Sequence, residues 1–227
     1  MKALLFDVFG TLVDWRTSIA RQMAARTDEA AAFADAWRGR YQPSMAAVRS
    51  GARPFVPLDT LHRESLDATL AEFAITASEA ERAEMTLFWH RLDAWPDVGD
   101  ALARLGRQAL LSPHSNGSVR LMVDLARHNR WRWDMILGAE VTGHYKPEPQ
   151  SYRRAAALLM LDPAECGFVA AHNSDLAAAR ACGFRTVFVR RPAEHGPRQT
   201  IDLEPTSDWD IVADNLSGVA DVLDAAG

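Results

Sequence analysis

Four groups of polar residues in this sequence have the types and positions that could carry out chemistry on a small molecule. Asp7 ends the first apolar run, Ser115 and Asn116 follow a later apolar segment, and Lys146 and Asp175 precede helical patterns. Some enzymes use a carboxylate as a nucleophile that forms a covalent intermediate, and a lysine beside such a carboxylate would lower its pKa and keep it ionised. If the four groups meet, they are suited to nucleophilic catalysis by an aspartate.

Lys146 is unusual in this chain, because only two of its 25 basic residues are lysines. Lysine and arginine are not chemically interchangeable, so a single mid-chain lysine among arginines indicates a specific role. The other residues have simpler interpretations when they are taken singly. Asp7 and Asn116 are of types common in turns, and Asp175 could cap the helix that follows it. Only the combination of all four groups favours a catalytic site.

The order of predicted elements would bring these groups together. Strands and helices alternate after residue 97, which indicates a parallel sheet with right-handed crossovers. Residues 17–90 are wholly helical in pattern, apart from a loop at 49–57. The expected fold is therefore a doubly wound α/β core, residues 1–14 and 97–227, with an all-helical cap inserted at 15–96. In such sheets the site lies beyond the carboxyl ends of the strands. The predicted strands are 3–8, 108–111, 135–137, 167–171, 186–189 and 209–212, and the predicted core helices are 98–105, with Asp97 as its cap, 119–127, 150–159, 176–182 and 216–225.

Composition restricts the class of protein. The 227 residues carry a net charge of −5 with no basic run, which argues against a nucleic-acid partner. No apolar stretch approaches the roughly 20 residues that span a bilayer, and the N-terminal apolar run is too short for a signal peptide. The two cysteines, Cys166 and Cys182, follow no metal-binding spacing and indicate reduced thiols. We expect a cytoplasmic protein without a membrane partner.

Four motifs in order resemble those of the haloacid dehalogenase superfamily, and specifically its type II 2-haloacid dehalogenases. The resemblance covers essentially the whole chain. The motifs are FDVFGTLV at 6–13, SNG at 115–117, YKPE at 145–148, and Asp175 followed by AAARACGF. The family implies that Asp7 attacks the carbon next to the substrate carboxylate, displaces halide, and is released from the resulting ester by water. It also implies that Lys146 keeps Asp7 ionised and that Asp175 holds Lys146 and positions or activates the water.

The resemblance implies roles for further residues. Thr11 would orient Asp7, and Ser115 and Asn116 would bind the substrate carboxylate or the halide side. Arg38, in WRGRYQ, matches the arginine that receives the halide, with Arg40 as its competitor. The remaining candidates for the substrate or halide pocket are Phe9, Tyr152, which could equally be a packing residue, and His172 or Asn173, either of which could fill the place of an asparagine that is common in the family.

Two other functions fit parts of the sequence. A magnesium-dependent small-molecule phosphatase of the same superfamily would carry a second aspartate two residues after the nucleophile, where this chain has Phe9. It would also need more acids near Asp175, because magnesium favours several oxygen ligands. A non-catalytic binding protein with a relict site would have no need of Asp7, Lys146 and Asp175 together. We therefore expect a dehalogenase with no metal and no cofactor and a small 2-haloacid as its substrate. The resemblance also makes a homodimer possible, because related enzymes are often dimers.

Overall fold

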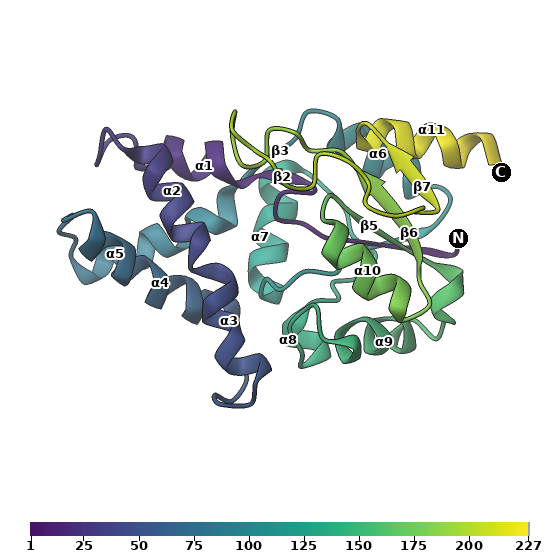
Figure 1. Cartoon of the computed structure of the whole chain (residues 1–227), viewed down its shortest axis with the longest axis horizontal. Helices are drawn as coiled ribbons and strands as arrows, with labels where there is room; N and C mark the ends of the chain where they lie inside the picture. Colours follow the sequence, from purple (N-terminus) through teal and green to yellow (C-terminus); the bar gives the residue numbers. More distant parts are fainter. Residues whose placement is uncertain (227) are drawn as a thin grey trace.

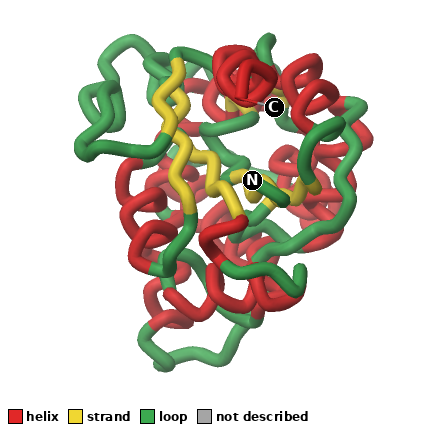
Figure 2. The backbone as a smooth tube through the Cα atoms, turned by 90° about the vertical axis from the view of Figure 1, so that its right-hand side faces the viewer, coloured by secondary structure: helices red, strands yellow, loops and turns green. Residues whose placement is uncertain are grey.

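A parallel sheet of five strands forms the centre of the structure, a computed structural model that describes residues 1–226. The strand order is β4-β1-β5-β6-β7, and every neighbouring pair is parallel. Figure 2 shows the strands between helices on both sides. The doubly wound α/β class predicted from the sequence is confirmed. The strands are β1 (Ala3–Phe6), β4 (Leu110–Pro113), β5 (Cys166–Ala170), β6 (Arg185–Val189) and β7 (Ile211–Ala213).

Alternate residues of β1 face two separate apolar clusters. Leu4 and Phe6 pack in a cluster with residues of α6, α7 and α11, whereas Ala3 and Leu5 pack in a cluster with residues of α9 and α10. Because successive side chains of a strand point to opposite faces, this division means that helices cover both faces of the sheet. These helices are α6 (Val98–Leu105), α7 (Val119–Asn129), α9 (Pro149–Leu158), α10 (Asn173–Ala181) and α11 (Leu216–Ala226), with the short α8 (Ala139–Thr142) and η2 (Pro163–Glu165) between them.

The helical segment predicted after the first strand lies beside the sheet, at the left of Figure 1. Its core is aromatic: Phe33, Trp37 and Trp89 are almost completely buried, and Trp37 and Trp89 meet edge to face. Among the described residues, no helix is both long and apolar enough to cross a membrane. The segment consists of α1 (Trp15–Met23), α2 (Ala30–Gly39), α3 (Tyr41–Arg49), α4 (Leu58–Glu72), α5 (Glu79–Thr86) and the 3-10 helix η1 (Leu87–Arg91).

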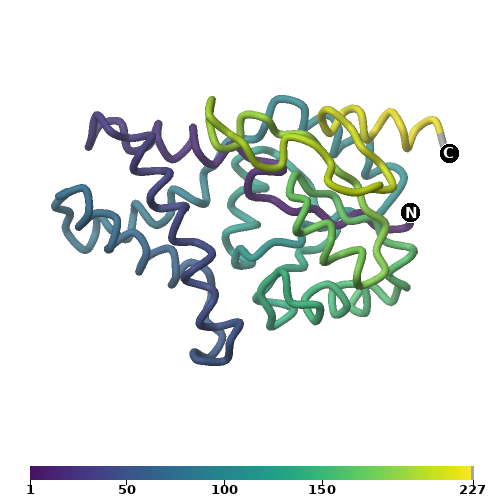
Figure 3. The backbone as a smooth tube through the Cα atoms, viewed as in Figure 1, coloured from purple at the N-terminus to yellow at the C-terminus, as the bar shows by residue number. Residues whose placement is uncertain are grey.

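The chain leaves the sheet and returns to it through a small antiparallel pair, β2 (Val13–Asp14) with β3 (Asp93–Ala94). Figure 3 shows the outgoing and returning segments at this point. The sequence did not predict this pair, because two residues per strand are too few to create an alternating pattern. The pair lies close to the boundaries at 14/15 and 96/97 that the sequence suggested, and the division into core and cap stays a prediction.

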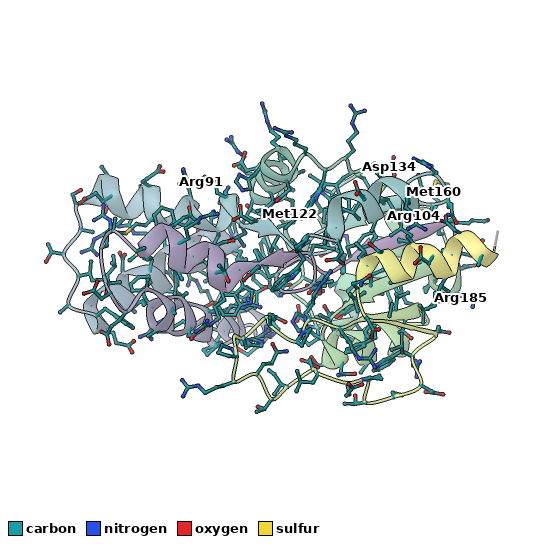
Figure 4. All side chains as sticks on the ribbon, turned by 90° about the horizontal axis from the view of Figure 1, so that it is seen from above. Arg91, Arg104, Met122, Asp134, Met160 and Arg185 are labelled. Carbon is teal, nitrogen blue, oxygen red and sulfur yellow. The ribbon has the colours of Figure 1, made fainter. Side chains whose placement is uncertain are left out.

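One local prediction is wrong, and a second is confirmed only in its position. No strand forms at 135–137. The backbone N–H groups of Asp134 and Leu137 do donate to carbonyl oxygens of β4, but the other hydrogen bonds between the two segments are made by side chains. The carboxylate of Asp134, labelled in Figure 4, accepts from Leu111 N at 2.8 Å, and Ser112 Oγ accepts from Leu137 N. Asp97 is the N-cap residue of α6, as predicted, but its side chain makes no cap hydrogen bond, because its carboxylate binds both terminal nitrogens of Arg191, at 2.8 and 2.9 Å.

Candidate active site

The carboxyl ends of β1, β4, β5 and β6 lead into one cavity of about 770 Å³. This is the edge at which parallel α/β sheets place their ligands. The loop before α9 adds Lys146, and α2 adds Arg38 from the helical segment. The cavity therefore joins the sheet to the helices beside it. Among the predicted site residues, those that line it are Asp7, Phe9, Arg38, Asn116, Lys146, His172 and Asp175.

Asp7 follows β1 directly, and its carboxylate has donors on both oxygens. Thr11 Oγ1 donates to Oδ2 at 2.7 Å, Lys146 Nζ donates to Oδ1 at 2.9 Å, and His172 Nδ1 lies 3.1 Å from Oδ2. Thr11 is itself fixed, because its hydroxyl accepts from Ala171 N. Burial alone would raise the pKa of Asp7, but Lys146 and His172 outweigh it and hold the pKa well below its usual range. The carboxylate is thus ionised and fixed in direction.

Lys146 links Asp7 to Asp175, since its ammonium donates to a carboxylate oxygen of each. Burial would lower the pKa of Lys146, but these two carboxylates raise it above its ordinary value. Asp175 lies in the first turn of α10, which begins two residues before it, and its other oxygen accepts from the hydroxyl of Tyr152. Lys146 is therefore a permanent cation, and both oxygens of Asp175 are engaged.

Glu194 is a site residue that the sequence analysis missed. It lies in the irregular segment after β6, is 1% exposed, and accepts from Trp15 Nε1 at 3.1 Å. Its carboxylate oxygens lie 2.9 and 3.1 Å from His172 Nε2. Burial would raise the pKa of Glu194, but the charges of His172 and Arg38 hold it below its ordinary value. No motif or periodicity marks this position in the sequence, because the contact depends on how the loop folds back over Gly10.

Arg38 lies against an aromatic wall of the same cavity. Its guanidinium carbon is 4.1 Å from the ring centre of Tyr41, 5.5 Å from that of Trp15 and 5.9 Å from that of Phe9. Its Nη1 is buried and has no hydrogen-bond partner among the described residues. A buried cationic donor without a partner is costly unless an anion fills the place. Arg40, the competing candidate, instead binds Glu72 and the hydroxyl of Thr69.

The remaining predicted residues are divided between the cavity and its support. Asn116 lines the cavity, and its Oδ1 accepts from Lys146 N at 2.7 Å, so Nδ2 is the amide atom that can donate toward the cavity. Ser115, Tyr152 and Asn173 do not line it. The Ser115 hydroxyl accepts from Gly117 N, and Tyr152 is buried behind Asp175.

The side chain of Asn173 faces away from Asp7. Its amide donates to Asp202 and to the backbone of Glu204, and it accepts from Thr206 N and Trp209 Nε1. In this structure the Asn173 side chain instead holds the 202–209 loop, and its role in the substrate pocket stays a prediction. Of the two neighbours weighed for this place, His172 is the one that touches Asp7.

The arrangement is suited to displacement by an anion. Asp7 is ionised, fixed by three donors and open to the cavity, while the unpartnered nitrogen of Arg38 offers a place for a second anion. Within residues 1–226, no group of three or more His, Cys, Asp or Glu side chains is arranged to hold a metal ion. A substrate with one negative charge and an anionic leaving group fits these charges.

Comparison with known proteins agrees with this chemistry. The model of the haloacid dehalogenase-like hydrolase family matches residues 1–183. The solved L-2-haloacid dehalogenase PA0810 is 46% identical, with a TM-score of 0.96 and 99% of each chain covered. The defluorinating L-2-haloacid dehalogenase Rha0230 is 47% identical, with a TM-score of 0.96 over 99% of this chain and 95% of that one. The (S)-2-haloacid dehalogenase of Xanthobacter autotrophicus is 27% identical over 84% of this chain and 76% of its own. Phosphatases match too, among them phosphoglycolate phosphatase 1 of Pseudomonas aeruginosa at 28% identity over 99% of this chain and 80% of its own.

Proposed function

The chain belongs to the haloacid dehalogenase-like hydrolase family, and from that premise we propose that it hydrolyses the carbon–halide bond of short 2-haloalkanoic acids to give 2-hydroxy acids. The observation that carries the proposal is a pair of opposite charges facing one cavity. Asp7 is the ionised carboxylate, and Arg38 is the guanidinium with an unpartnered nitrogen on an aromatic wall. The first can attack a carbon atom, and the second can receive the halide that leaves it.

In the first step a carboxylate oxygen of Asp7 attacks C2 of the substrate. The new carbon–oxygen bond forms as the carbon–halogen bond breaks, and the halide leaves with the bonding electron pair. Thr11 and Lys146 hold the nucleophile in one direction, which supplies much of the rate when the reacting atoms must align. Arg38 stabilises charge that develops only as the halide departs, so its contribution lowers the barrier.

In the second step water attacks the carbonyl carbon of the Asp7 ester. The acyl–oxygen bond breaks, the 2-hydroxy acid leaves, and the carboxylate is regenerated. Asn116 donates through Nδ2 to the substrate carboxylate, with its amide oriented by Lys146 N. Helices α1 to α5 act as a cap that brings Arg38 over the nucleophile and excludes bulk water.

We include fluoroacetate among the substrates. Fluoride is the smallest and most strongly hydrated halide, so its departure needs close donors in a desolvated site. Arg38, His172 and Lys146 all line the cavity and carry N–H donors. The similarity to the defluorinating dehalogenase supports the same extension. The cytoplasmic location, the homodimer and the absence of a nucleic-acid partner stay predictions.

The phosphatase alternative has no observation in its favour at this site. Phe9, two residues after the nucleophile, is apolar and 2% exposed, so it cannot protonate a leaving group. Asp7 and Asp175 already share the ammonium of Lys146. A phosphate dianion would face these two carboxylates and Glu194, and among the described residues no group of three or more acids is arranged to hold a neutralising metal.

A halide-release assay tests the proposed function. Wild-type protein and Asp7→Asn are incubated with chloroacetate, each enantiomer of 2-chloropropionate and fluoroacetate, with and without EDTA. We expect wild type to release halide equally in both conditions and Asp7→Asn to release none. Activity that survives in Asp7→Asn would exclude the covalent route. Phosphate release from p-nitrophenyl phosphate that is abolished by EDTA would favour the phosphatase.

A further inference from the structure

Two ionisable residues of the cavity, His172 and Glu194, have no proton-transfer role in the two steps described above. His172 bridges two carboxylates: Nδ1 lies 3.1 Å from Asp7 Oδ2, and Nε2 lies 2.9 Å from Glu194 Oε2. A ring with a carboxylate at each nitrogen carries a proton on both. Burial would lower the pKa of His172, but Glu194 and Asp7 raise it well above its ordinary value. The resting site therefore holds a carboxylate, an imidazolium and a second carboxylate in a row.

Hydrolysis of an ester on Asp7 needs a base, and Lys146 and Asp175, which line the cavity near Asp7, are already engaged in hydrogen bonds to each other. Lys146 is held as a cation by two carboxylates, so it donates protons and does not accept them. Asp175 also lines the cavity and burial raises its pKa, but neither of its oxygens is free, because one accepts from Lys146 and the other from Tyr152. His172 is adjacent to Asp7, lines the cavity and has a carboxylate behind it.

We propose that His172 is the general base that activates water against the Asp7 ester, and that Glu194 is the residue that positions it. This inference rests on the proposed function, because it concerns the second step of that reaction. It differs from the family expectation stated above, in which Asp175 positions or activates the water. The same order of groups, a carboxylate behind an imidazole, is used by hydrolases that activate a nucleophile or a water molecule.

The proton inventory of the two steps balances. Alkylation converts Asp7 into a neutral ester, so one of the two negative charges that hold the His172 proton disappears. Nδ1 then releases that proton to solvent, while Nε2 keeps its proton toward Glu194. Water attacks the ester carbonyl as Nδ1 takes one of its protons, and Nδ1 passes this proton to the departing alkoxide. The remaining water proton leaves the new Asp7 carboxyl group for Nδ1, which restores the imidazolium. Each turnover consumes one water and releases one halide and one proton.

Glu194 is held where the proposal requires it. It is 1% exposed, and Trp15 Nε1 donates to its Oε1. Because Gly10 has no side chain, the Glu194 carboxylate can lie directly against the turn that follows Asp7. The charged and titratable groups around His172 and Glu194 are Asp7 from the β1 end, with Lys146 and Asp175 behind it, and Arg38 and His195 beside Glu194. Of these, only Asp7 changes charge during the proposed reaction, and it does so when the ester forms.

The test measures the decay of the ester directly. Wild type, His172→Asn and Glu194→Gln are mixed with excess 2-chloropropionate, rapidly desalted, and followed by intact-protein mass spectrometry and by mapping of the peptide that contains Asp7. We expect ester decay to slow about 100-fold or more in His172→Asn, and less in Glu194→Gln, in line with loss of a general base. The surface variant His128→Gln removes another histidine paired with an acid and should decay like wild type.

The pH dependence of decay separates a base from a structural residue. In wild type, ester decay should slow as the pH falls and His172 retains its proton, and in His172→Asn this limb should be absent. Decay at the wild-type rate in both variants would overturn the proposal. So would a His172→Asn protein that folds but forms no ester, because His172 would then serve the first step. If His172→Asn does not fold, the decay rate of the ester in Glu194→Gln tests the proposal: slower decay than in wild type would support it, and decay at the wild-type rate would overturn it. The absence of both halide release and ester in wild type would instead refute the proposed function.

Discussion

Lys146 Nζ lies 2.9 Å from Asp7 Oδ1 and also bonds Asp175, so one ammonium joins residues from the β1 end, the loop before α9 and the first turn of α10. Its side chain is 6% exposed, which removes most of the screening that weakens ion pairs in water. A buried pair that loses one partner leaves an uncompensated charge behind. The chemistry of Asp7 therefore depends on Lys146 more than a surface ion pair would suggest.

Removing this ammonium should nearly abolish halide release. In Lys146→Met the carboxylate of Asp7 loses its main electrostatic partner. The pKa of Asp7 then rises, because the effect of burial is no longer offset by a neighbouring ammonium. We expect the halide-release rate to fall roughly 10²- to 10⁴-fold, the range for a positioned ionisable group. Lys2→Met is the matched control, since Lys2 pairs with Glu165 at the surface with its side chain 67% exposed. A Lys146→Met variant with wild-type activity would contradict this role.

The first half-reaction should be insensitive to moderate acid. The pKa of Asp7 is held well below its usual range, so the nucleophile remains ionised at every pH above the ordinary value of about 4. The burst of halide measured by rapid quench should therefore stay level from pH 8 to roughly pH 5. In Lys146→Met the residual burst should fall within this interval, because the raised pKa protonates part of the carboxylate. A wild-type burst that declines from pH 7 downward would show that another group limits the step.

Substitutions of Arg38 and Arg40 should have very different effects on catalysis, although the two residues are only two positions apart. Arg38 lies in the last turn of α2, and Arg40 directly follows the helix. The guanidinium of Arg38 stacks on Tyr41 at 4.1 Å inside the cavity, whereas Arg40 binds Glu72 and Thr69. Lysine lacks the planar fork that stacks on aromatic rings and offers several donors. We expect Arg38→Lys to lower kcat roughly 100-fold or more and Arg40→Lys to change it less than about twofold. Equal effects of the two variants on steady-state halide release would remove Arg38 from the mechanism.

The sequence was sufficient for those parts of the site that depend on local pattern and strand order. The apolar run before Asp7 and the alternation of strands and helices predicted a parallel sheet, and the carboxyl ends of its strands do meet at the cavity. The rarity of lysine identified Lys146, which contacts both aspartates. These inferences succeed because they use only residue types and their spacing, which the sequence gives directly.

The parts that the sequence did not reveal depend on how loops fold over one another. Asn173 and His172 are adjacent in sequence. The path of the 202–209 loop determines which of them contacts Asp7: Asn173 binds the loop, and His172 faces Asp7. Glu194 follows a proline- and arginine-containing stretch that has no periodic pattern, and its contact with His172 spans 22 positions of sequence separation. Asp97 holds the predicted cap position, but its side-chain partner Arg191 lies 94 positions away. Long-range ion pairs of this kind leave no signal in a single sequence.

Gly10 offers a last test that links folding to the site. Its φ is +87°, and a Cβ built on it would lie 2.0 Å from Glu194 Oε1 and 2.2 Å from Cδ. An alanine there must adopt an unfavourable backbone conformation and push the buried carboxylate aside. We expect Gly10→Ala to lower the free energy of unfolding by roughly 2 kcal/mol or more, measured by urea denaturation.

The matched control is Gly99→Ala in α6, where an added Cβ meets nothing within 4 Å. That change should raise the free energy of unfolding by up to about 0.5–1 kcal/mol, because alanine favours helix over glycine. If Gly10→Ala remains folded at low temperature, its Glu194 is displaced from His172, and the Asp7 ester should decay as slowly as in Glu194→Gln. A Gly10→Ala protein as stable as Gly99→Ala would mean that, in solution, the loop that carries Glu194 does not contact the turn around Gly10.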